Sequence, residues 1–155
     1  MTEDRLLLDV MLGKLATYLR MCGYDTLYAQ EEGVEADDAT RRLAEREGRT
    51  LVTRDRQLAA QTDGAVLLTT REVDDQLREL AERGFAIELP DEPKRCSVCN
   101  GRVDRLGESD PRPEHAPDGI VPIWQCRECG QHFWKGSHWE RVTAIVGKIA
   151  GDSNP

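Results

Sequence analysis

The fold is decided by residues 5–23, which read RLLLDVMLGKLATYLRMCG. The three consecutive leucines from Leu6 to Leu8 are typical of a short strand that is buried on both faces. Apolar residues then recur at helical spacing from Leu12 to Cys22. The next residue, Gly23, is of a type that commonly ends helices. A buried strand that leads directly into an amphipathic helix predicts a parallel sheet covered by helices.

The same alternation of strands and helices continues along the chain. Further strands are expected at 26–29, 50–53, 65–68 and 85–89, and helices at 37–47, directly after 55 and at 73–83. Asp37 or Asp38 is placed to cap the second helix, and Gly48 to end it. The sequence therefore predicts the α/β class, with a mainly parallel sheet flanked by helices.

Charge divides the 155-residue chain into two unequal parts. Residues 1–92 hold 12 basic and 21 acidic side chains, whereas residues 93–155 hold 9 and 8. The change falls at residues 90–93, whose sequence PDEP is typical of a boundary between domains. We predict one domain at 1–92 and a second at 93–155.

The formal net charge is −8, and 17 of the 21 basic residues are arginine. Such a surface suits a halophilic host, but an ordinary acidic protein has the same composition, and both interpretations stay open. No apolar run reaches the roughly 18 to 20 residues that span a bilayer, so no membrane span is expected. The acidic N-terminus lacks the pattern of a secretory signal, which predicts a cytoplasmic location.

Four of the five cysteines form two Cys-x-x-Cys pairs separated by 26 residues. The pairs are Cys96 with Cys99 and Cys126 with Cys129. Four thiolates form the tetrahedral shell that Zn²⁺ prefers and leave no open position for a catalytic water. We therefore predict a structural zinc site, followed by a closing helix to about Ile149 with Ser137 as its N-cap.

Four aspartates follow or precede predicted elements at one edge of the sheet. Asp9 and Asp55 come directly after strands, while Asp37 and Asp38 begin the intervening helix. The carboxyl ends of parallel strands meet at one edge, so these side chains are expected to share a cleft. Each acid alone is explained by helix capping. Together they would repel by roughly 4 kcal/mol per pair at about 4 Å and an effective dielectric of 20, which favours a bound Mg²⁺ or Mn²⁺.

Hard cations held by two or three carboxylates are the usual apparatus for phosphodiester hydrolysis. Lys14 and Arg54 lie close in sequence to Asp9 and Asp55. These two cations either hold substrate phosphates or are solvated surface charges, and the sequence leaves both interpretations open.

Several short motifs occur together in this chain. They are LLDVMLGKL at 7–15, GYD at 23–25, DD at 37–38, TRD at 53–55, both cysteine pairs and GSHW at 136–139. In this combination, over about residues 6–141, the chain resembles the Mut-seven C-terminal ribonuclease family. The resemblance implies a PIN-like nuclease domain with an appended zinc ribbon, and RNA as the substrate of a metal-dependent ribonuclease. It also implies that Asp9, the Asp37/Asp38 pair and Asp55 form the acidic site.

Two features of the sequence have no single interpretation, and two alternatives to a ribonuclease stay open. A fourth acid is not assigned, although Thr69, Thr70, Glu72, Asp74 and Asp75 follow the fourth strand. The aromatic residues of the ribbon, Trp124, Phe133, Trp134 and Trp139, either stack single-stranded bases or form the ribbon core. The alternatives to a ribonuclease are a non-catalytic RNA- or ribosome-binding module and a toxin-like nuclease controlled by a partner protein.

Overall fold

A four-stranded, wholly parallel sheet forms the centre of the computed structural model, which describes residues 4–116, 119 and 122–153. The strands lie in the order β2-β1-β3-β4. Their bounds are β1 Arg5–Leu8, β2 Asp25–Tyr28, β3 Thr50–Thr53 and β4 Val66–Leu67. Each neighbouring pair is parallel, which confirms the predicted α/β class.

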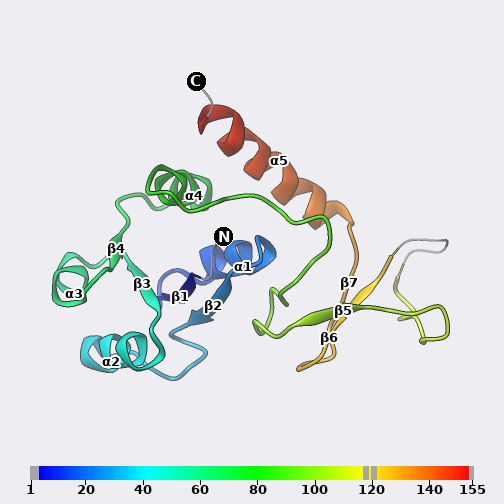
Figure 1. Ribbon diagram of the computed structural model, residues 1–155, viewed down its shortest axis with the longest axis horizontal. Helices are drawn as coiled ribbons and strands as arrows, with labels where there is room; N and C mark the ends of the chain where they lie inside the picture. Colours follow the sequence, from blue (N-terminus) through cyan, green and yellow to red (C-terminus); the bar gives the residue numbers. More distant parts are fainter. Residues whose placement is uncertain (1–3, 117–118, 120–121, 154–155) are drawn as a thin grey trace.

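Helices cover both faces of this sheet (Figure 1). Their bounds are α1 Gly13–Met21, α2 Asp37–Glu47, α3 Arg56–Gln61, α4 Val73–Glu82 and α5 Ser137–Ser153. Leu6 and Leu8 pack in one apolar cluster with residues of α1, α4 and α5. Leu7 packs on the other face with residues of α2 and α3. The leucine run is therefore buried on both faces because successive strand side chains alternate.

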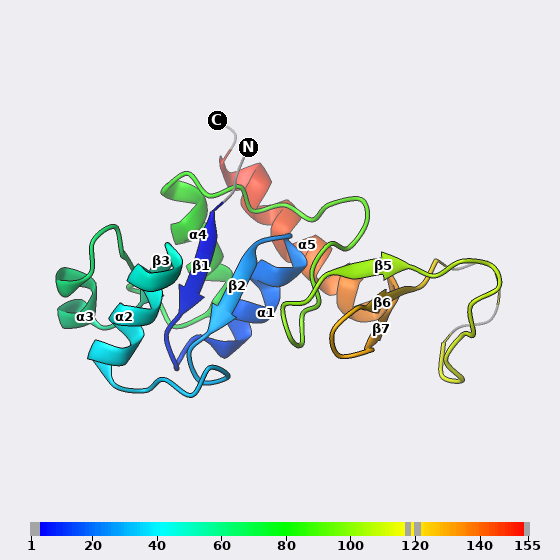
Figure 2. The same ribbon diagram turned by 60° about the horizontal axis from the view of Figure 1, so that its bottom comes forward.

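A small antiparallel sheet forms the second part of the molecule. It consists of β5 Val103–Arg105, β6 Trp124–Cys126 and β7 His132–Phe133 in that order. Beyond it, α5 returns to the parallel sheet, where Val142, Val146 and Ile149 join the cluster that contains Leu6 and Leu8. The chain therefore leaves the parallel-sheet part for the ribbon and comes back to complete its core (Figures 1 and 2).

The ribbon is attached to the edge strand β2 by the side chain of Asn100. Asn100 Oδ1 accepts a hydrogen bond from the backbone N–H of Thr26 (2.9 Å), and Asn100 Nδ2 donates to Asp25 Oδ1 (2.8 Å). Asp25 also pairs with Arg49 at 2.9 Å. The amide of Asn100 thus occupies the edge of β2 as a neighbouring strand would.

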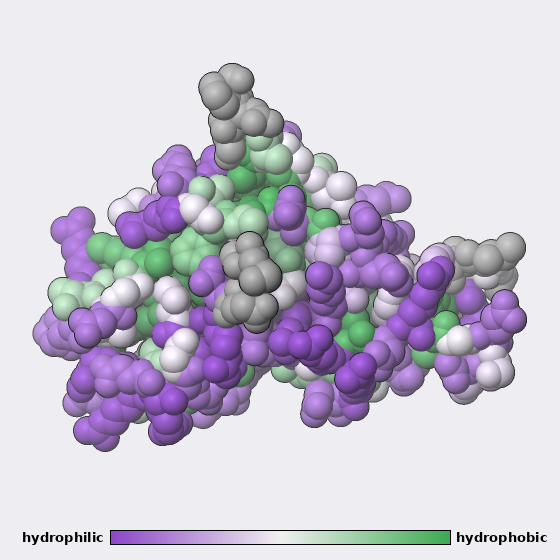
Figure 3. Space-filling view, in the orientation of Figure 1, coloured by the Kyte–Doolittle hydropathy of each residue, from purple (hydrophilic) through white to green (hydrophobic). Residues whose placement is uncertain are grey.

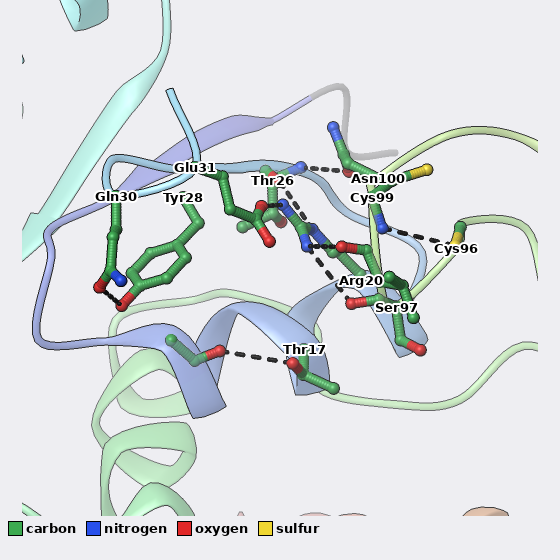
Figure 4. Close-up of polar contacts among 12 residues, drawn as sticks. Thr17, Arg20, Thr26, Tyr28, Gln30, Glu31, Cys96, Ser97, Cys99 and Asn100 are labelled. Carbon is green, nitrogen blue, oxygen red and sulfur yellow. Dashed lines mark hydrogen bonds and ion pairs between the residues drawn. The ribbon is translucent and has the colours of Figure 1, made fainter. Parts of the chain in front are cut away.

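Arg20 ties the same parts together from α1, and its side chain is only 3% exposed. Its Nε donates to the carbonyl of Thr26 (2.9 Å), and Nη1 donates to the carbonyls of Ser97 (3.3 Å) and Val98 (3.2 Å). Its charge is paired with Glu31 at 2.7 Å (Figure 4). This guanidinium joins α1, β2, the segment after β2 and the first cysteine turn.

The strand predicted at 85–89 is wrong, because these residues form no strand in the structure. Ile87 is buried in the core, and the Phe85 ring contacts Tyr24 edge-on at 6.2 Å. The hydroxyl of Tyr24 donates to the carbonyl of Ala86 (3.0 Å). The alternation of apolar residues here reflects packing against the α1 and α4 layer and not pairing within the sheet.

Two predicted helix caps are also wrong. The N-cap of α2 is Ala36, so Asp37 and Asp38 are the first residues inside the helix. Ser137 is likewise the first residue of α5, and the carbonyl of Gly136 accepts the first helical hydrogen bond, from Glu140. None of the helices in the described part of the chain combines the length and apolar character needed to cross a membrane.

Candidate functional site

The carboxyl ends of the parallel strands bring aspartate side chains to one edge of the sheet. In Figure 2, β1 and β2 point the same way, and the chain leaves their ends to enter α1 and to run on toward α2. Asp9 follows β1 directly, and its backbone N–H donates to the carbonyl of Val52 in β3 (3.1 Å). The position of Asp9 is therefore fixed by the hydrogen-bond ladder of the sheet.

Asp9 is a buried carboxylate, 6% exposed, with donors on both oxygens. The N–H of Val10 donates to Oδ1 (2.8 Å), and the hydroxyl of Thr53 donates to Oδ2 (2.7 Å). The same Thr53 hydroxyl accepts from the backbone N–H of Asp55 (3.0 Å). One buried hydroxyl thus links the two aspartates that follow β1 and β3.

Asp55 has two roles at the end of β3. Its Oδ1 caps α3 by accepting from the N–H groups of Gln57 (2.9 Å) and Leu58 (3.1 Å). Within the described part of the chain, Oδ2 has no hydrogen-bond partner. Capping therefore accounts for one oxygen of Asp55 and leaves the other available to a ligand.

Asp37 and Asp38 begin α2 but differ in their surroundings. Asp38 is exposed and pairs with Arg41 one turn along the helix, at 3.6 Å. Partial desolvation and the negative charges of Asp55, Asp9 and Asp38 raise the pKa of Asp37 above its ordinary value. Asp37 is exposed as well but lies near enough to Asp55 and Asp9 for their charges to act on it, and we name Asp9, Asp37 and Asp55 the acid edge.

The three carboxylates of the acid edge do not converge on one point. Among the described residues, the only group of three or more Asp, Glu, His or Cys whose ligand atoms all lie within 4.8 Å of one another is the cysteine cluster described below. The three aspartates thus share one edge of the sheet without meeting at that distance. Figure 3 shows hydrophilic side chains gathered over α2, at the lower left of that view.

Two cations adjoin the acid edge without ion pairs to it. Arg54 is half-buried between Thr53 and Asp55, and its Nε is buried without a hydrogen-bond partner in the described structure. Lys14 is exposed in the first turn of α1, and no ion pair joins it to a described residue. A buried N–H donor without a partner is costly, and this atom is closed to solvent.

The turn that carries the acid edge into α1 is held by Tyr28. The Tyr28 hydroxyl donates to the carbonyl of Val10 (2.6 Å) and lies close to Gly13. A Cβ atom on Gly13 would lie 3.0 Å from that hydroxyl oxygen. Glycine is therefore needed here for the close approach of the tyrosine ring.

Sequence reasoning left the acid after β4 unassigned, and the structure brings Glu79 of α4 to that position. Its carboxylate accepts from the N–H and hydroxyl groups of both Thr69 and Thr70, at 2.5–3.2 Å. Burial opposes its ionisation, but these donors hold the pKa of Glu79 below its ordinary value. Because both oxygens are engaged by donors, Glu79 secures the turn after β4.

The four cysteines form a compact cluster of free thiols at the base of the ribbon. The Sγ atoms are 3.7 Å apart for Cys96 and Cys129 and 3.5 Å apart for Cys99 and Cys126. A tetrahedron with bonds of roughly 2.3 Å has edges of about 3.8 Å, whereas a disulfide is about 2.05 Å long. The cluster therefore fits a single zinc ion, as the spacing predicts.

Each cysteine pair lies on a tight turn whose backbone N–H groups point at sulfur. Sγ of Cys126 accepts from the N–H of Glu128 (3.3 Å) and of Cys129 (3.5 Å). Burial opposes ionisation of Cys126, but these donors lower its pKa to about 7. The two turns, residues 96–101 and 126–130, are named the zinc knuckles.

The fit of the two knuckles depends on Gly101. A Cβ atom at this position would lie 2.6 Å from Cγ of Glu128 and 2.9 Å from Sγ of Cys126. Asn100, directly before it, has the left-handed φ of 73° that asparagine tolerates better than most residues. Asn100 therefore both shapes the first knuckle and binds β2.

Comparison with known proteins gives one match. The sequence model of the family described as "Mut7-C RNAse domain" matches residues 4–146, nearly the whole chain. No curated protein and no solved structure matches. The matched region contains both the acid edge and the zinc knuckles.

Proposed function

The chain belongs to the Mut7-C RNAse domain family, and from this premise we propose that it is a ribonuclease that depends on Mg²⁺ or Mn²⁺. The family supports RNA as the substrate class. The observation that carries the metal-dependent mechanism is the acid edge, where Asp9, Asp37 and Asp55 come from three different elements. The zinc ion held by the cysteines has a structural role in this proposal.

The residues of the acid edge fit a hard divalent cation. Their donor atoms are carboxylate oxygens, which Mg²⁺ and Mn²⁺ prefer over the sulfur and nitrogen ligands typical of zinc. Desolvation and then the charges of Asp55, Asp9 and Asp38 raise the pKa of Asp37, and a bound cation would relieve the repulsion among these charges. When bound, such an ion neutralises charge on the scissile phosphate and supplies an activated water.

The neighbouring side chains orient the acids and bind the substrate. Thr53 fixes the carboxylate plane of Asp9, and the α3 cap fixes that of Asp55. Half-buried Arg54 and exposed Lys14 would bind the phosphates on either side of the cleaved bond. Two local cations offset the unfavourable net charge of the chain, −8, at the point where RNA is bound.

A second candidate function is a non-catalytic RNA-binding module. It is favoured by the observation that Asp55 caps α3 and so has a role without any ion. In that case the zinc ribbon makes the RNA contacts and the acid edge is structural. Binding without cleavage distinguishes this function from the first.

The test compares the wild type with Asp9→Asn on circular and linear single-stranded RNA, with Mg²⁺ or Mn²⁺ titrated in. We expect ion-dependent cleavage by the wild type, at least about 100-fold slower in the variant because several kcal/mol of charge stabilisation are lost. Cleavage of the circle shows endonuclease action, since it has no ends. Asp63→Asn is the matched control, because Asp63 is exposed and precedes β4 at the opposite edge of the sheet.

Two results would contradict the proposal. Cleavage by Asp9→Asn at the wild-type rate would show that the acid edge is not the catalytic site. RNA binding by the wild type with no cleavage at any ion concentration would support the binding module instead.

A further inference from the structure

A cavity of about 290 Å³ lies where the ribbon meets α1 and α5, away from the acid edge. We name it the aromatic cavity after the side chains that form most of its wall. The wall includes the rings of His132, Phe133, Trp134, His138 and Trp139 and the side chain of Arg95. The volume is at the lower end of the range for small-molecule sites, which suits one planar group and not a folded partner.

The charge of the aromatic cavity is opposite to that of the molecule. The chain carries 29 acidic residues, yet none of the described residues that line the cavity is acidic. Arg95 is the charged residue of the wall; it is half-buried, donates to the carbonyl of Asn100 (3.1 Å) and pairs with Asp25 at 3.6 Å. Nearby, Lys135 Nζ lies 5.2 Å from the centre of the Trp139 ring. Aromatic faces with nearby cations match a ligand that is planar and attached to an anion.

The motif at 136–139, which the acid edge does not use, contributes to this cavity. A Cβ atom on Gly136 would lie 3.2 Å from Nε1 of the Trp134 indole, so glycine permits the ring to pack over the backbone. His138 contacts the Tyr18 ring of α1 edge-on at 6.4 Å. The buried Trp124, in contrast, is 3% exposed and belongs to the ribbon interior. The ribbon aromatics therefore divide into a core residue and residues that line the cavity.

We propose that the aromatic cavity binds one unstacked base of single-stranded RNA, and so forms a second RNA contact outside the acid edge. The inference rests on the proposed function for its choice of nucleic acid. Trp139 and Trp134, whose ring centre lies 5.3 Å from that of His115, would stack on the base, and Arg95 and Lys135 are the nearby cations for its phosphate. A duplex cannot use this site, because its bases are paired and stacked within the helix.

The helix α1 separates the aromatic cavity from the acid edge. Met21, at the C-terminal end of α1, lines the cavity, while Gly13, at the other end, adjoins the acid edge. The nine residues of α1 separate these ends by roughly 13 Å. The cavity and the acid edge therefore lie at opposite ends of α1, whose middle is buried in the core.

The experiment measures binding of a labelled single-stranded adenosine oligonucleotide by fluorescence anisotropy, with no added Mg²⁺ or Mn²⁺. We expect Trp134→Ala to bind about 5- to 150-fold more weakly, the loss typical of removing one base-stacking ring. Trp134→Phe retains a stacking face and is expected to lose far less. Trp124→Phe is the matched control, because it removes a tryptophan that lies outside the cavity, and its affinity is expected to stay within about twofold of the wild type.

Photo-crosslinking of the wild-type chain to RNA that contains 4-thiouridine needs no variant and gives an independent result. Cross-links to Trp134 or Trp139 support the proposal, whereas cross-links confined to other parts of the chain overturn it. Unchanged affinity of folded, zinc-loaded Trp134→Ala for the oligonucleotide also overturns the proposal. Binding of an apolar peptide in the cavity that RNA does not displace overturns it as well.

The binding assay and the cleavage assay test the two proposals independently. A wild-type chain that binds RNA through Trp134 without cutting it refutes the nuclease and keeps the cavity. A chain that cuts RNA but whose KM is unchanged by Trp134→Ala refutes the cavity and keeps the nuclease.

Discussion

The substitution Thr53→Val tests whether one hydroxyl organises the acid edge. Thr53 is fully buried, and its hydroxyl donates to Asp9 Oδ2 at 2.7 Å while it accepts from the N–H of Asp55 at 3.0 Å. Valine keeps the branched shape of threonine and its preference for strands but has no hydroxyl. The substitution therefore removes two hydrogen bonds with little change in packing.

The magnitude follows from the burial of Asp9, which is 6% exposed. A hydrogen bond to a charged group contributes about 1.5–3 kcal/mol, and the bond from Asp55 adds about 1 kcal/mol. We expect the free energy of unfolding to fall by about 2.5–4 kcal/mol in total. For a chain of this size that corresponds to a melting temperature lower by roughly 5–15 °C.

The assay is urea unfolding of four proteins, namely the wild type, each single variant and the double variant with Asp9→Asn. With asparagine at position 9 the bond to that residue is neutral, so the cost of Thr53→Val is expected to fall to about 2 kcal/mol, about 1 kcal/mol for each of the two bonds. Thr62→Val is the matched control, because Thr62 is also buried but its hydroxyl donates only to the carbonyl of Leu58 (2.8 Å). Equal losses for Thr53→Val in both backgrounds would refute the view that the hydroxyl holds a buried charge.

Three further predictions concern the acid edge, the zinc knuckles and the turn after β4. Asp37→Asn removes repulsion between carboxylates, so without divalent ions the free energy of unfolding should rise by less than about 1 kcal/mol. In calorimetry, Mn²⁺ should raise the melting temperature of the wild type but not that of this variant. Gly101→Ala should lower zinc affinity in competition with a coloured chelator, because its Cβ would lie 2.9 Å from Sγ of Cys126, whereas Gly147→Ala, with nothing within 4 Å, should not. The pKa of Glu79 is lowered in the folded state, so its contribution to stability is present above the unfolded value near 4.5 and is lost as the pH falls through the folded value. Urea unfolding of wild type and Glu79→Gln should therefore differ at pH 7 and converge in acid.

The fold was predictable because its signals are local. The leucine run at 6–8, the helical spacing that follows it and the left-handed glycine at 48 (φ 65°) each report their own segment. The segment 85–89 was misread because its alternation has the period of a strand, although its side chains pack on helices. Periodicity reveals which residues are buried and not which partner buries them.

The candidate site was predictable only in part, for the same reason. The rule that parallel strands end at one edge indicated Asp9 and Asp55. It did not separate Asp37 from Asp38, which depends on the rotation of α2, nor did it show the hydroxyl of Thr53 between the acids. Glu79 was missed because a helix brings it back to Thr69, ten residues earlier.

The zinc knuckles stabilise the parallel sheet as well as the ribbon. β2 is an edge strand, and an unpaired edge is a site of aggregation unless it is covered. Asn100 covers it by accepting from the N–H of Thr26, a contact across 74 residues, and Arg20 holds the first knuckle in place from α1. Zinc binding contributes roughly 10–16 kcal/mol, so we expect a zinc ion on Cys96 and Cys99 to stabilise the knuckle in which Asn100 has its left-handed conformation. We therefore expect chelation of zinc to expose the edge of β2, so that the metal would protect the sheet that carries the acid edge without taking part in the proposed chemistry.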